Sequence, residues 1–320
     1  MAVHWLAELD GSSLAIEVPA SSANLGAGYD CLGLALAMVN RIEVEVRVWS
    51  RGAIELTVEG EGRDELSEDR GNRFVQGLEA TLRKARGELP EGLGWRIRMR
   101  NEIPLSRGLG SSAAATVAGA LAGNDLAGEP LSTNELLALA TEIEGHPDNA
   151  AAALLGGFVV SAASADGVDA IRFDAPRQLQ AVLFIPDLRL GTGAMRAALP
   201  PSVPLADAVS NLGAVAVGVA GLATGQYDLL RRLTVDRLHE PYRAAIYPQL
   251  PQMVAAARSA GALGACLSGA GSAILAFADS TATIARIETA FTTAAADGDL
   301  PGRVSVIEPR NEGARIVARS

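Results

Sequence analysis

Pro104-Leu-Ser-Arg-Gly-Leu-Gly-Ser-Ser-Ala-Ala-Ala115 reads as a glycine-rich loop that runs straight into a helix. Gly108 and Gly110 allow a tight turn, and Ser111 and Ser112 can cap the alanine-rich segment that follows. The first N–H groups of a helix have no partner within it and lie at the positive end of its dipole, so an anion binds there favourably. The stretch therefore predicts a phosphate site, with two hydroxyls for a phosphate oxygen or a magnesium ion. A well-capped core helix would have the same local composition.

Other nucleotide-binding motifs do not fit this chain. A Walker-type loop needs Gly-x-x-x-x-Gly-Lys followed by Ser or Thr, and the single lysine, Lys84, lies far from any glycine-rich loop. A complete Gly-x-Gly-x-x-Gly does not occur, so a dinucleotide-binding Rossmann domain loses its main support. We therefore expect any fixed cation at the site to be an arginine.

Composition limits the class of protein. The 320 residues are 49% hydrophobic, which is enough for one large or two medium domains. A net charge of −10 argues against nucleic acid or an acidic membrane as the main partner. Cys31 and Cys266 are too few for a metal cluster or a disulfide scaffold, and residues 1–10 lack the features of a signal peptide, so we expect a cytoplasmic protein. Residues 259–278 carry no charge, but their Gly, Ala and Ser content argues against a membrane span.

Apolar alternation and capping residues predict the elements of the first half. Residues 41–48 alternate between Ile or Val and charged side chains, which predicts a half-exposed strand, with residues 53–58 as its hairpin partner. Ser132 and Glu135 form a capping box that opens a helix reaching about Glu144. The other expected elements are strands at 14–19 and 95–101, a helix at 72–84, and a hairpin of 154–161 with 168–173.

We place a domain boundary near residue 175, which gives an N-terminal domain of residues 1–174 and a C-terminal αβ domain of residues 175–320. The elements expected in the second domain are a strand at 179–185, a helix at 205–224, an arginine-rich helix at 227–238, strands at 265–267 and 273–277 around the glycine turn 268–272, and a last strand at 303–307.

Three stretches carry a family resemblance. The string from Pro104 to Ala114 resembles the ATP phosphate-binding motif of the GHMP small-molecule kinases, a family that includes galactokinase, homoserine kinase, mevalonate kinase and phosphomevalonate kinase. Residues 19–33, PASSANLGAGYDCLG, and residues 144–149, EGHPDN, resemble motifs of the homoserine kinase branch. Ala27 stands where that branch commonly has proline, with little expected consequence. The glycine turn 268–272 is similar to the third motif of the family, which packs against the phosphate loop.

The resemblance implies an α+β fold with two domains: an N-terminal one like the second domain of ribosomal protein S5, and a ferredoxin-like C-terminal one, with the site between them. It implies ATP as phosphoryl donor, Mg²⁺ as cofactor, and L-homoserine as acceptor, giving O-phospho-L-homoserine on the route to threonine. Family members are often dimers, so a homodimer is expected. The alternatives are another GHMP kinase, such as a mevalonate kinase, and a non-catalytic member, against which the intact glycine-rich loop argues.

The resemblance also implies roles for individual residues. Ser112 and Glu142 would hold Mg²⁺, with Glu144 as the alternative to Glu142. Asp148 and Asn149 are the catalytic candidates: some family members use an aspartate base, whereas homoserine kinases are thought to orient the hydroxyl with the asparagine and to pass the proton to the γ-phosphate or solvent. The candidates for ATP binding are Asn72, Pro104, Leu105, Ser106, Arg107, Gly108, Leu109, Gly110, Ser111, Ser112, Ala113 and Ala114. The candidates for acceptor binding are Asn24, Asp30, His146, Asn149, Thr192, Arg196 and Arg243, in which the two arginines would hold the carboxylate.

Overall fold

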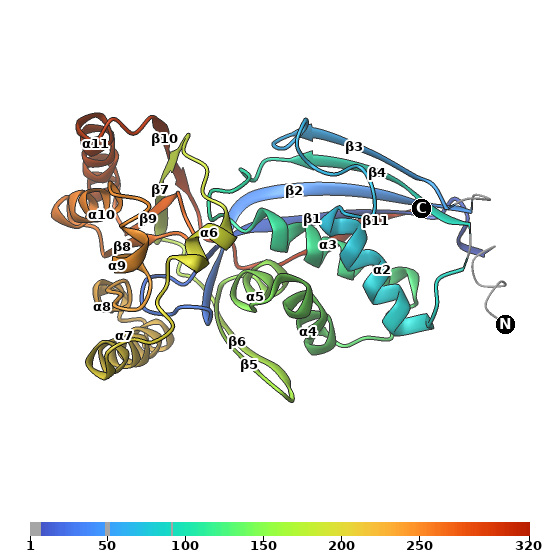
Figure 1. The fold of residues 1–320 in the computed structure, drawn as a ribbon, viewed down its shortest axis with the longest axis horizontal. Helices are drawn as coiled ribbons and strands as arrows, with labels where there is room; N and C mark the ends of the chain where they lie inside the picture. The colour runs from blue at the N-terminus through green and yellow to red at the C-terminus, as the bar shows by residue number, and fades with distance from the viewer. Residues whose placement is uncertain (1–7, 49–51, 91) are drawn as a thin grey trace.

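Two β-sheets, each packed with helices, make up the structure (Figure 1). It is a computed structural model, and it describes residues 8–48, 52–90 and 92–320. The first sheet has seven strands, in the order β11-β1-β2-β4-β3, with β5 paired to β2 and β6 paired to β5. The second sheet has four strands in the order β10-β7-β9-β8.

Long antiparallel strands form the centre of the first sheet. These are β1 (Ser13–Ala23), β2 (Leu32–Val48) and β4 (Leu93–Asn101). The predicted alternation holds in β2, where Ile42, Val44 and Val46 are buried and the charged residues between them are not. One face of this sheet is therefore apolar and packs against helices, while the other carries charged side chains.

The predicted hairpin between residues 41–48 and residues 53–58 is wrong, although the second segment does form a strand. This segment is β3 (Ile54–Gly60), and it pairs in parallel with β4 rather than with β2. The connection from β3 to β4 contains helix α2 (Arg73–Arg86), and a parallel pair needs such a crossover. Local alternation predicts the strand but carries no information about which strand lies beside it.

Helices α2, α3 (Ser111–Leu126), α4 (Thr133–Glu144) and α5 (Asp148–Leu155) lie together below the first sheet in the view of Figure 1. The predicted capping box of Ser132 and Glu135 opens α4. Gly77, which weakens α2 as an isolated helix, allows α2 and α3 to pack closely, because a Cβ there would lie 2.2 Å from the carbonyl oxygen of Thr116.

The second sheet contains β7 (Gln180–Pro186), β8 (Gly264–Leu267), β9 (Ile274–Ala278) and β10 (Gly302–Ile307), all antiparallel. Helices α10 (Leu250–Ser259) and α11 (Thr281–Asp297) follow the pattern of a ferredoxin-like unit. The rejection of residues 259–278 as a membrane span is confirmed, because this segment forms the β8–β9 hairpin. The predicted strands at 265–267 and 273–277 are confirmed by the same hairpin.

Between β7 and β8 the chain forms α6 (Thr192–Ala197), α7 (Leu205–Thr224), the short 3₁₀ helix η1 (Tyr227–Leu229), α8 (Leu230–Leu233) and α9 (Glu240–Arg243). Helix α7 is long and apolar enough to cross a membrane by length and composition alone. Its Asn211 is buried and donates hydrogen bonds to Asp236 and to the carbonyl oxygen of Ala27. That face of α7 therefore packs against the protein through a polar anchor.

The expected single helix at residues 227–238 is wrong, because α8 ends at Leu233. The Thr234 hydroxyl donates to the carbonyl oxygen of Leu230, and the Asp236 carboxylate accepts from the backbone N–H groups of Leu238, His239 and Glu240. These side chain to backbone hydrogen bonds compete with the helix and open α9 instead.

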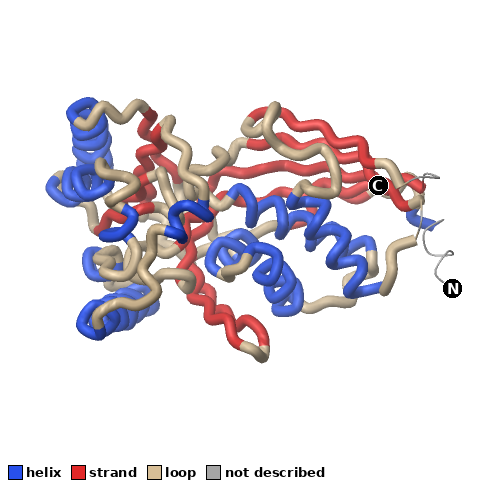
Figure 2. Tube along the Cα trace, in the orientation of Figure 1, coloured by secondary structure: helices blue, strands red, loops and turns tan. Residues whose placement is uncertain are grey.

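The chain returns to the first sheet at its C-terminal end (Figure 2). Strand β11 (Arg315–Arg319) pairs antiparallel with β1, although the sequence analysis places the last strand at residues 303–307. Strands β5 (Phe158–Ser164) and β6 (Gly167–Phe173) precede the boundary expected near residue 175. That boundary stays a proposal; the largest apolar core contains residues of both sheets, and the rings of Phe158 and Phe277 lie 6.0 Å apart within it.

Candidate active site

A cavity of about 320 Å³ lies where the two sheets meet, and both halves of the chain line it. The predicted site residues in its wall are Asn24, Asp30, Asn72, Pro104, Leu105, Ser106, Gly108, Leu109, Gly110, Ser111, Ser112, Ala113, His146, Asp148, Asn149, Thr192, Arg196 and Arg243. Three other predicted residues, Arg107, Ala114 and Glu142, are not among the residues of this wall.

The phosphate loop, residues 104–110, connects β4 to α3. The residue that precedes α3 is Gly110, in a left-handed conformation with φ 72°, so Ser111 and Ser112 are the first helical residues rather than the caps. Among the described residues, no side chain caps this helix. The N-terminus of α3 thus faces the cavity with the features that favour a bound anion.

The glycine turn, residues 268–272, packs against the phosphate loop, as its resemblance to the third motif implies. The Ser268 hydroxyl lies 2.8 Å from the carbonyl oxygen of Gly108, and the backbone N–H of Ala273 donates to the carbonyl oxygen of Arg107 at 3.0 Å. A Cβ on Gly108 would lie only 1.9 Å from the carbonyl oxygen of Ser268. The phosphate loop is therefore held from the second sheet by backbone contact that only glycine permits.

Two of the expected ATP residues point elsewhere. The guanidinium of Arg107 donates to the backbone carbonyls of Leu105, Pro186 and Asp187, so this side chain anchors the loop rather than facing the cavity. Ala114 is fully buried in the core. Asn72 lines the cavity and caps α2, accepting from the backbone N–H of Phe74.

The expected Mg²⁺ ligand Glu142 is exposed and lies away from the cavity. Its alternative, Glu144, accepts hydrogen bonds from the hydroxyls of Ser112 at 3.0 Å and Thr116 at 2.7 Å. Of these two glutamates only Glu144 faces α3 and the cavity, because two residues along a helix point to different sides. These three hydroxyl and carboxylate side chains offer the hard oxygen ligands that Mg²⁺ prefers, so they fit such an ion.

The acceptor loop, residues 24–31, contributes an ion pair with α6. The guanidinium of Arg196 donates to both carboxylate oxygens of Asp30, at 2.6 and 2.9 Å, and to the Tyr29 hydroxyl at 2.8 Å. The side chain of Asn24 is engaged at both ends: its amide N–H donates to Gly269 and its oxygen accepts from the backbone of Asp30. Asn24 and Asp30 both have positive φ angles, so the loop concentrates strained backbone at the cavity.

Arg243, the second expected carboxylate ligand, lines the same cavity although it is 1% exposed. The guanidiniums of Arg196 and Arg243 each lie 5.5 Å from the centroid of the Tyr29 ring. Burial lowers the pKa of Arg243, and the nearby Arg196 acts in the same direction. Two guanidiniums thus lie close to one aromatic ring.

His146, Asp148 and Asn149 form a hydrogen-bonded group at the start of α5. The Nδ1 atom of His146 lies 2.6 Å from Asp148 Oδ1, which also accepts from the backbone N–H of Asn149 at 2.7 Å. Burial lowers the pKa of His146, but the hydrogen bond and the charge of Asp148 outweigh it and the pKa is raised overall. The Asn149 side chain accepts from the Ser21 hydroxyl at 2.9 Å.

Sequence reasoning missed several residues that the structure brings to the site. Thr116 follows Ser112 by four residues, and this helical spacing was a usable signal. Tyr29 lies inside a quoted motif, whereas Asn40 carries no motif signal although it lines the cavity and accepts from the backbone of Glu102 and Ile103.

Comparisons with known proteins show which family the chain belongs to. The model of the GHMP kinases N terminal domain matches residues 72–157, and the model of the GHMP kinases C terminal domain matches residues 219–297. A homoserine kinase of Moorella thermoacetica is 39% identical over 94% of this chain and 99% of its own. One of Caldicellulosiruptor bescii is 40% identical over 95% of this chain and 96% of its own.

Solved structures give the same result. The homoserine kinase of Cytophaga hutchinsonii has a TM-score of 0.83 and 31% identity, covering 95% of this chain and 97% of that one. The mevalonate kinase of L. major, in complex with R-mevalonate, has a TM-score of 0.61 over 93% of this chain and 95% of that one, and at 16% identity it shows the fold alone. Both domain models match this chain, and relatives at about 40% identity cover most of it. The chain therefore belongs to the GHMP kinase family. Within that family its relatives at about 40% identity are homoserine kinases.

Proposed function

We propose that this chain transfers the γ-phosphoryl group of ATP to the side-chain hydroxyl of L-homoserine, giving O-phospho-L-homoserine for threonine synthesis in the cytoplasm. The relatives named as homoserine kinases support the acceptor, and kinases of this family use ATP as co-substrate. The observation that carries the proposal is the ion pair of Arg196 with Asp30 in the same cavity as the phosphate loop.

This ion pair suits a zwitterionic acceptor. In the structure the two charges neutralise each other, with Arg196 donating to both oxygens of Asp30. An amino acid that binds between them exchanges one internal pair for two new ones, carboxylate to guanidinium and ammonium to carboxylate. Arg243 supplies a second guanidinium for the carboxylate. A sugar has neither charge, and mevalonate has no ammonium to satisfy Asp30.

The other end of the cavity suits the nucleotide. The free N–H groups at the start of α3 would hold the phosphates, and the Ser112 hydroxyl with Glu144 would hold Mg²⁺. The ion, when bound, neutralises charge on the phosphates during transfer. The residues of the phosphate loop therefore bind and orient ATP, which is most of what phosphoryl transfer requires of a protein.

Asp148 and Asn149 lie between the two ends. Asn149 is placed beside the phosphate loop, since a Cβ on Gly110 would lie 3.0 Å from its side-chain oxygen. We propose that the Asn149 side chain orients the hydroxyl group of the acceptor. As that oxygen bonds to the γ-phosphorus and the bond to the β-phosphate oxygen breaks, the hydroxyl proton passes to Asp148, with a γ-phosphate oxygen as the alternative acceptor.

The experiment is ADP release by the purified protein with ATP and Mg²⁺, comparing L-homoserine, D-homoserine, L-threonine, mevalonate and galactose, with the product identified by mass. We expect turnover mainly with L-homoserine, and turnover only with mevalonate or galactose would refute the proposal. Asp148→Asn should lower kcat by about 100-fold or more if Asp148 takes the proton, and by less than about tenfold if the phosphate does. The expected homodimer stays a prediction, and sedimentation velocity would test it.

A further inference from the structure

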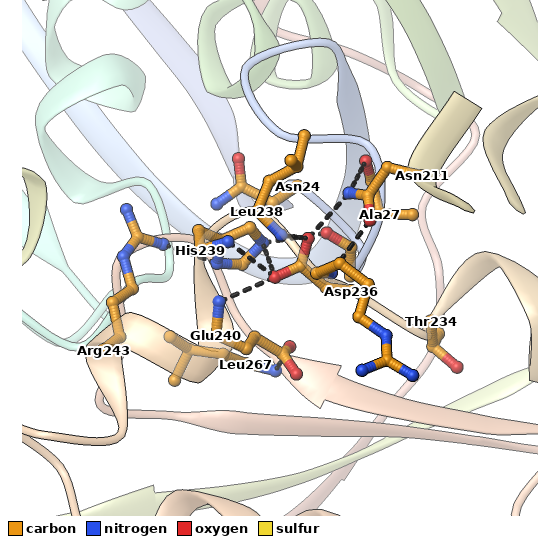
Figure 3. Close-up of polar contacts among 12 residues, drawn as sticks. Asn24, Ala27, Asn211, Thr234, Asp236, Leu238, His239, Glu240, Arg243 and Leu267 are labelled. Carbon is orange, nitrogen blue, oxygen red and sulfur yellow. Dashed lines mark hydrogen bonds and ion pairs between the residues drawn. The ribbon is translucent and has the colours of Figure 1, made fainter. Parts of the chain in front are cut away.

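A buried polar network that includes Asn211, Asp236 and His239 lies behind the acceptor end of the cavity (Figure 3). His239 precedes α9 and is 0% exposed, yet both ring nitrogens have partners. Its Nδ1 lies 3.0 Å from a guanidinium nitrogen of Arg243, and its Nε2 lies 2.8 Å from the carbonyl oxygen of Gly26. The imidazole therefore connects an expected carboxylate ligand to the acceptor loop.

The partners determine which nitrogen carries the proton. A guanidinium only donates hydrogen bonds, so Nδ1 of His239 must be an acceptor without hydrogen. A carbonyl oxygen only accepts, so Nε2 must carry the hydrogen that Gly26 receives. Burial lowers the pKa of His239 to about 4. The charge of Asp236 raises this pKa, and the charge of Arg243 lowers it further. A neutral ring with hydrogen on Nε2 satisfies both contacts, whereas a protonated ring would direct an N–H at Arg243.

The backbone of His239 is held by the side chain of Asp236. Asp236 accepts from the backbone N–H of His239 at 2.8 Å, and Asn211 of α7 bridges Asp236 to the carbonyl oxygen of Ala27. The Tyr29 ring lies 5.3 Å from the imidazole. The network thus contacts three residues of the acceptor loop, Gly26, Ala27 and Tyr29, and it also holds Arg243.

We propose that His239 is a positioning residue for acceptor binding: its neutral imidazole sets the guanidinium of Arg243 and the acceptor loop that carries Asp30 at a fixed separation. The two groups expected to receive the carboxylate and the ammonium of the acceptor lie on different elements, and the ring is bonded to both elements. This inference rests on the proposed function, because it assigns Arg243 and Asp30 to the two ends of an amino acid.

Two substitutions at this one position separate the contacts. In His239→Gln the side-chain amide can reach the place of Nε2 and still donate to Gly26, but the acceptor at Nδ1 is lost, and Arg243 keeps only its hydrogen bonds to the carbonyl oxygens of Gly269 and Met195. In His239→Asn the side-chain oxygen takes the place of Nδ1 and still accepts from Arg243, but the bond to Gly26 is lost. We expect His239→Gln to raise KM for L-homoserine by about tenfold, with kcat and KM for ATP within about twofold of the wild type. We expect a rise of less than about threefold for His239→Asn.

The tautomer gives a readout that does not depend on turnover. Two-bond ¹H–¹⁵N correlation on histidine-labelled protein, with the signal of His239 identified by its loss in His239→Gln, should show a neutral ring with hydrogen on Nε2. Hydrogen on Nδ1, a charged ring at pH 7.5, or equal KM values in folded Gln and Asn variants would overturn the inference. A wild-type protein with the expected tautomer that phosphorylates none of the acceptors would refute the proposed function instead, and would leave the contact between His239 and Arg243 established.

Discussion

Glu142 and Glu144 are only two positions apart in the sequence, but their side chains have different environments in the structure. Glu144 accepts from Ser112 and Thr116, and Glu142 faces solvent. We predict that Glu144→Gln lowers kcat/KM for ATP by about tenfold or more and raises the Mg²⁺ concentration needed for half-maximal rate, because the amide is a weaker ligand for a hard cation. Steady-state rates across a Mg²⁺ titration would check this.

Glu142→Gln is the matched control and should stay within about twofold of the wild type in the same titration. Equal losses in the two variants, or a larger loss for Glu142→Gln, would return the metal role to Glu142. Both carboxylates were candidates because Glu144 opens the motif of residues 144–149 and Glu142 lies two residues before it. The sequence could not choose between them, since the choice depends on which face of α4 meets α3.

At this scale the site was largely predictable, and the reason is local. Gly108, Gly110 and Ser112 lie within one loop and one helical turn, so their proximity follows from the sequence itself. Arg107 was misplaced because its partners are carbonyls at residues 186 and 187, which only the tertiary fold brings close. The role of His239 could not be predicted, because its contact with Gly26 depends on two segments that are distant in the sequence.

At the scale of elements, the contact between the phosphate loop and the glycine turn gives a sharp prediction. Gly108→Ala should reduce kcat/KM for ATP by about 100-fold and lower Tm, because the added Cβ would meet the carbonyl oxygen of Ser268 at 1.9 Å and φ is +71°. ADP release and thermal unfolding would be measured together.

Gly225→Ala is its control, because Gly225 is in the left-handed helical region with φ +74°, and nothing lies within 4 Å of the added Cβ. It should cost only about 1 kcal/mol of backbone strain and leave the activity unchanged. If both variants lost the same stability and neither lost activity, the close packing of the two loops would not matter for ATP binding.

The contact between α9 and β8 predicts a pH effect. Glu240 accepts from the backbone N–H of Leu267 at 2.7 Å, and burial raises its pKa to about 8, with Asp236 in the same direction and Arg258 and Arg243 opposed. Between about pH 5 and 8 the folded state keeps a proton that the unfolded state releases, so the stability of the wild type falls as pH rises. Glu240→Gln should therefore gain stability relative to the wild type over this range, on the order of 2 kcal/mol by pH 8.

Thermal unfolding of the two proteins at pH 5, 6, 7 and 8 would check this, with the exposed Glu88→Gln as control. A difference between Glu240→Gln and the wild type that stays constant with pH would contradict a raised pKa. A wild type that gains on the variant as pH rises would reverse the sign.

Helices and strands were predicted correctly where the sequence pattern within a segment determines the structure. The predictions failed where contacts with distant residues determine it. The strand at residues 41–48 and the capping box at Ser132 were right because their signals are internal to the segment. The partner of β3 and the end of α8 were wrong, since the first depends on the crossover through α2 and the second on the Asp236 carboxylate.

At the scale of the whole molecule, the largest core is shared by both sheets. Phe158 of the first sheet and Phe277 of the second are both in it, with ring centroids 6.0 Å apart. We predict one cooperative unfolding transition in calorimetry, and a lower Tm without splitting in Phe277→Leu, with a loss of about 1–3 kcal/mol.

Phe291→Leu is the comparison, because Phe291 packs against Phe184 in the core of the second sheet alone. Phe291→Leu should lower the Tm of the same single transition. Two transitions in the wild type, with only one moved by Phe291→Leu, would show that the halves unfold independently and would support a boundary at residue 175.

Strand β11 has a consequence for synthesis. Because it pairs with β1 and lies at residues 315–319, the first sheet cannot be completed until that part of the chain has been made. From residue 174 to residue 319, translation at about 5–20 residues per second takes roughly 10–30 s. Throughout that interval the outer edge of β1 offers unpaired N–H and C=O groups to any other extended chain, which favours aggregation of the nascent protein.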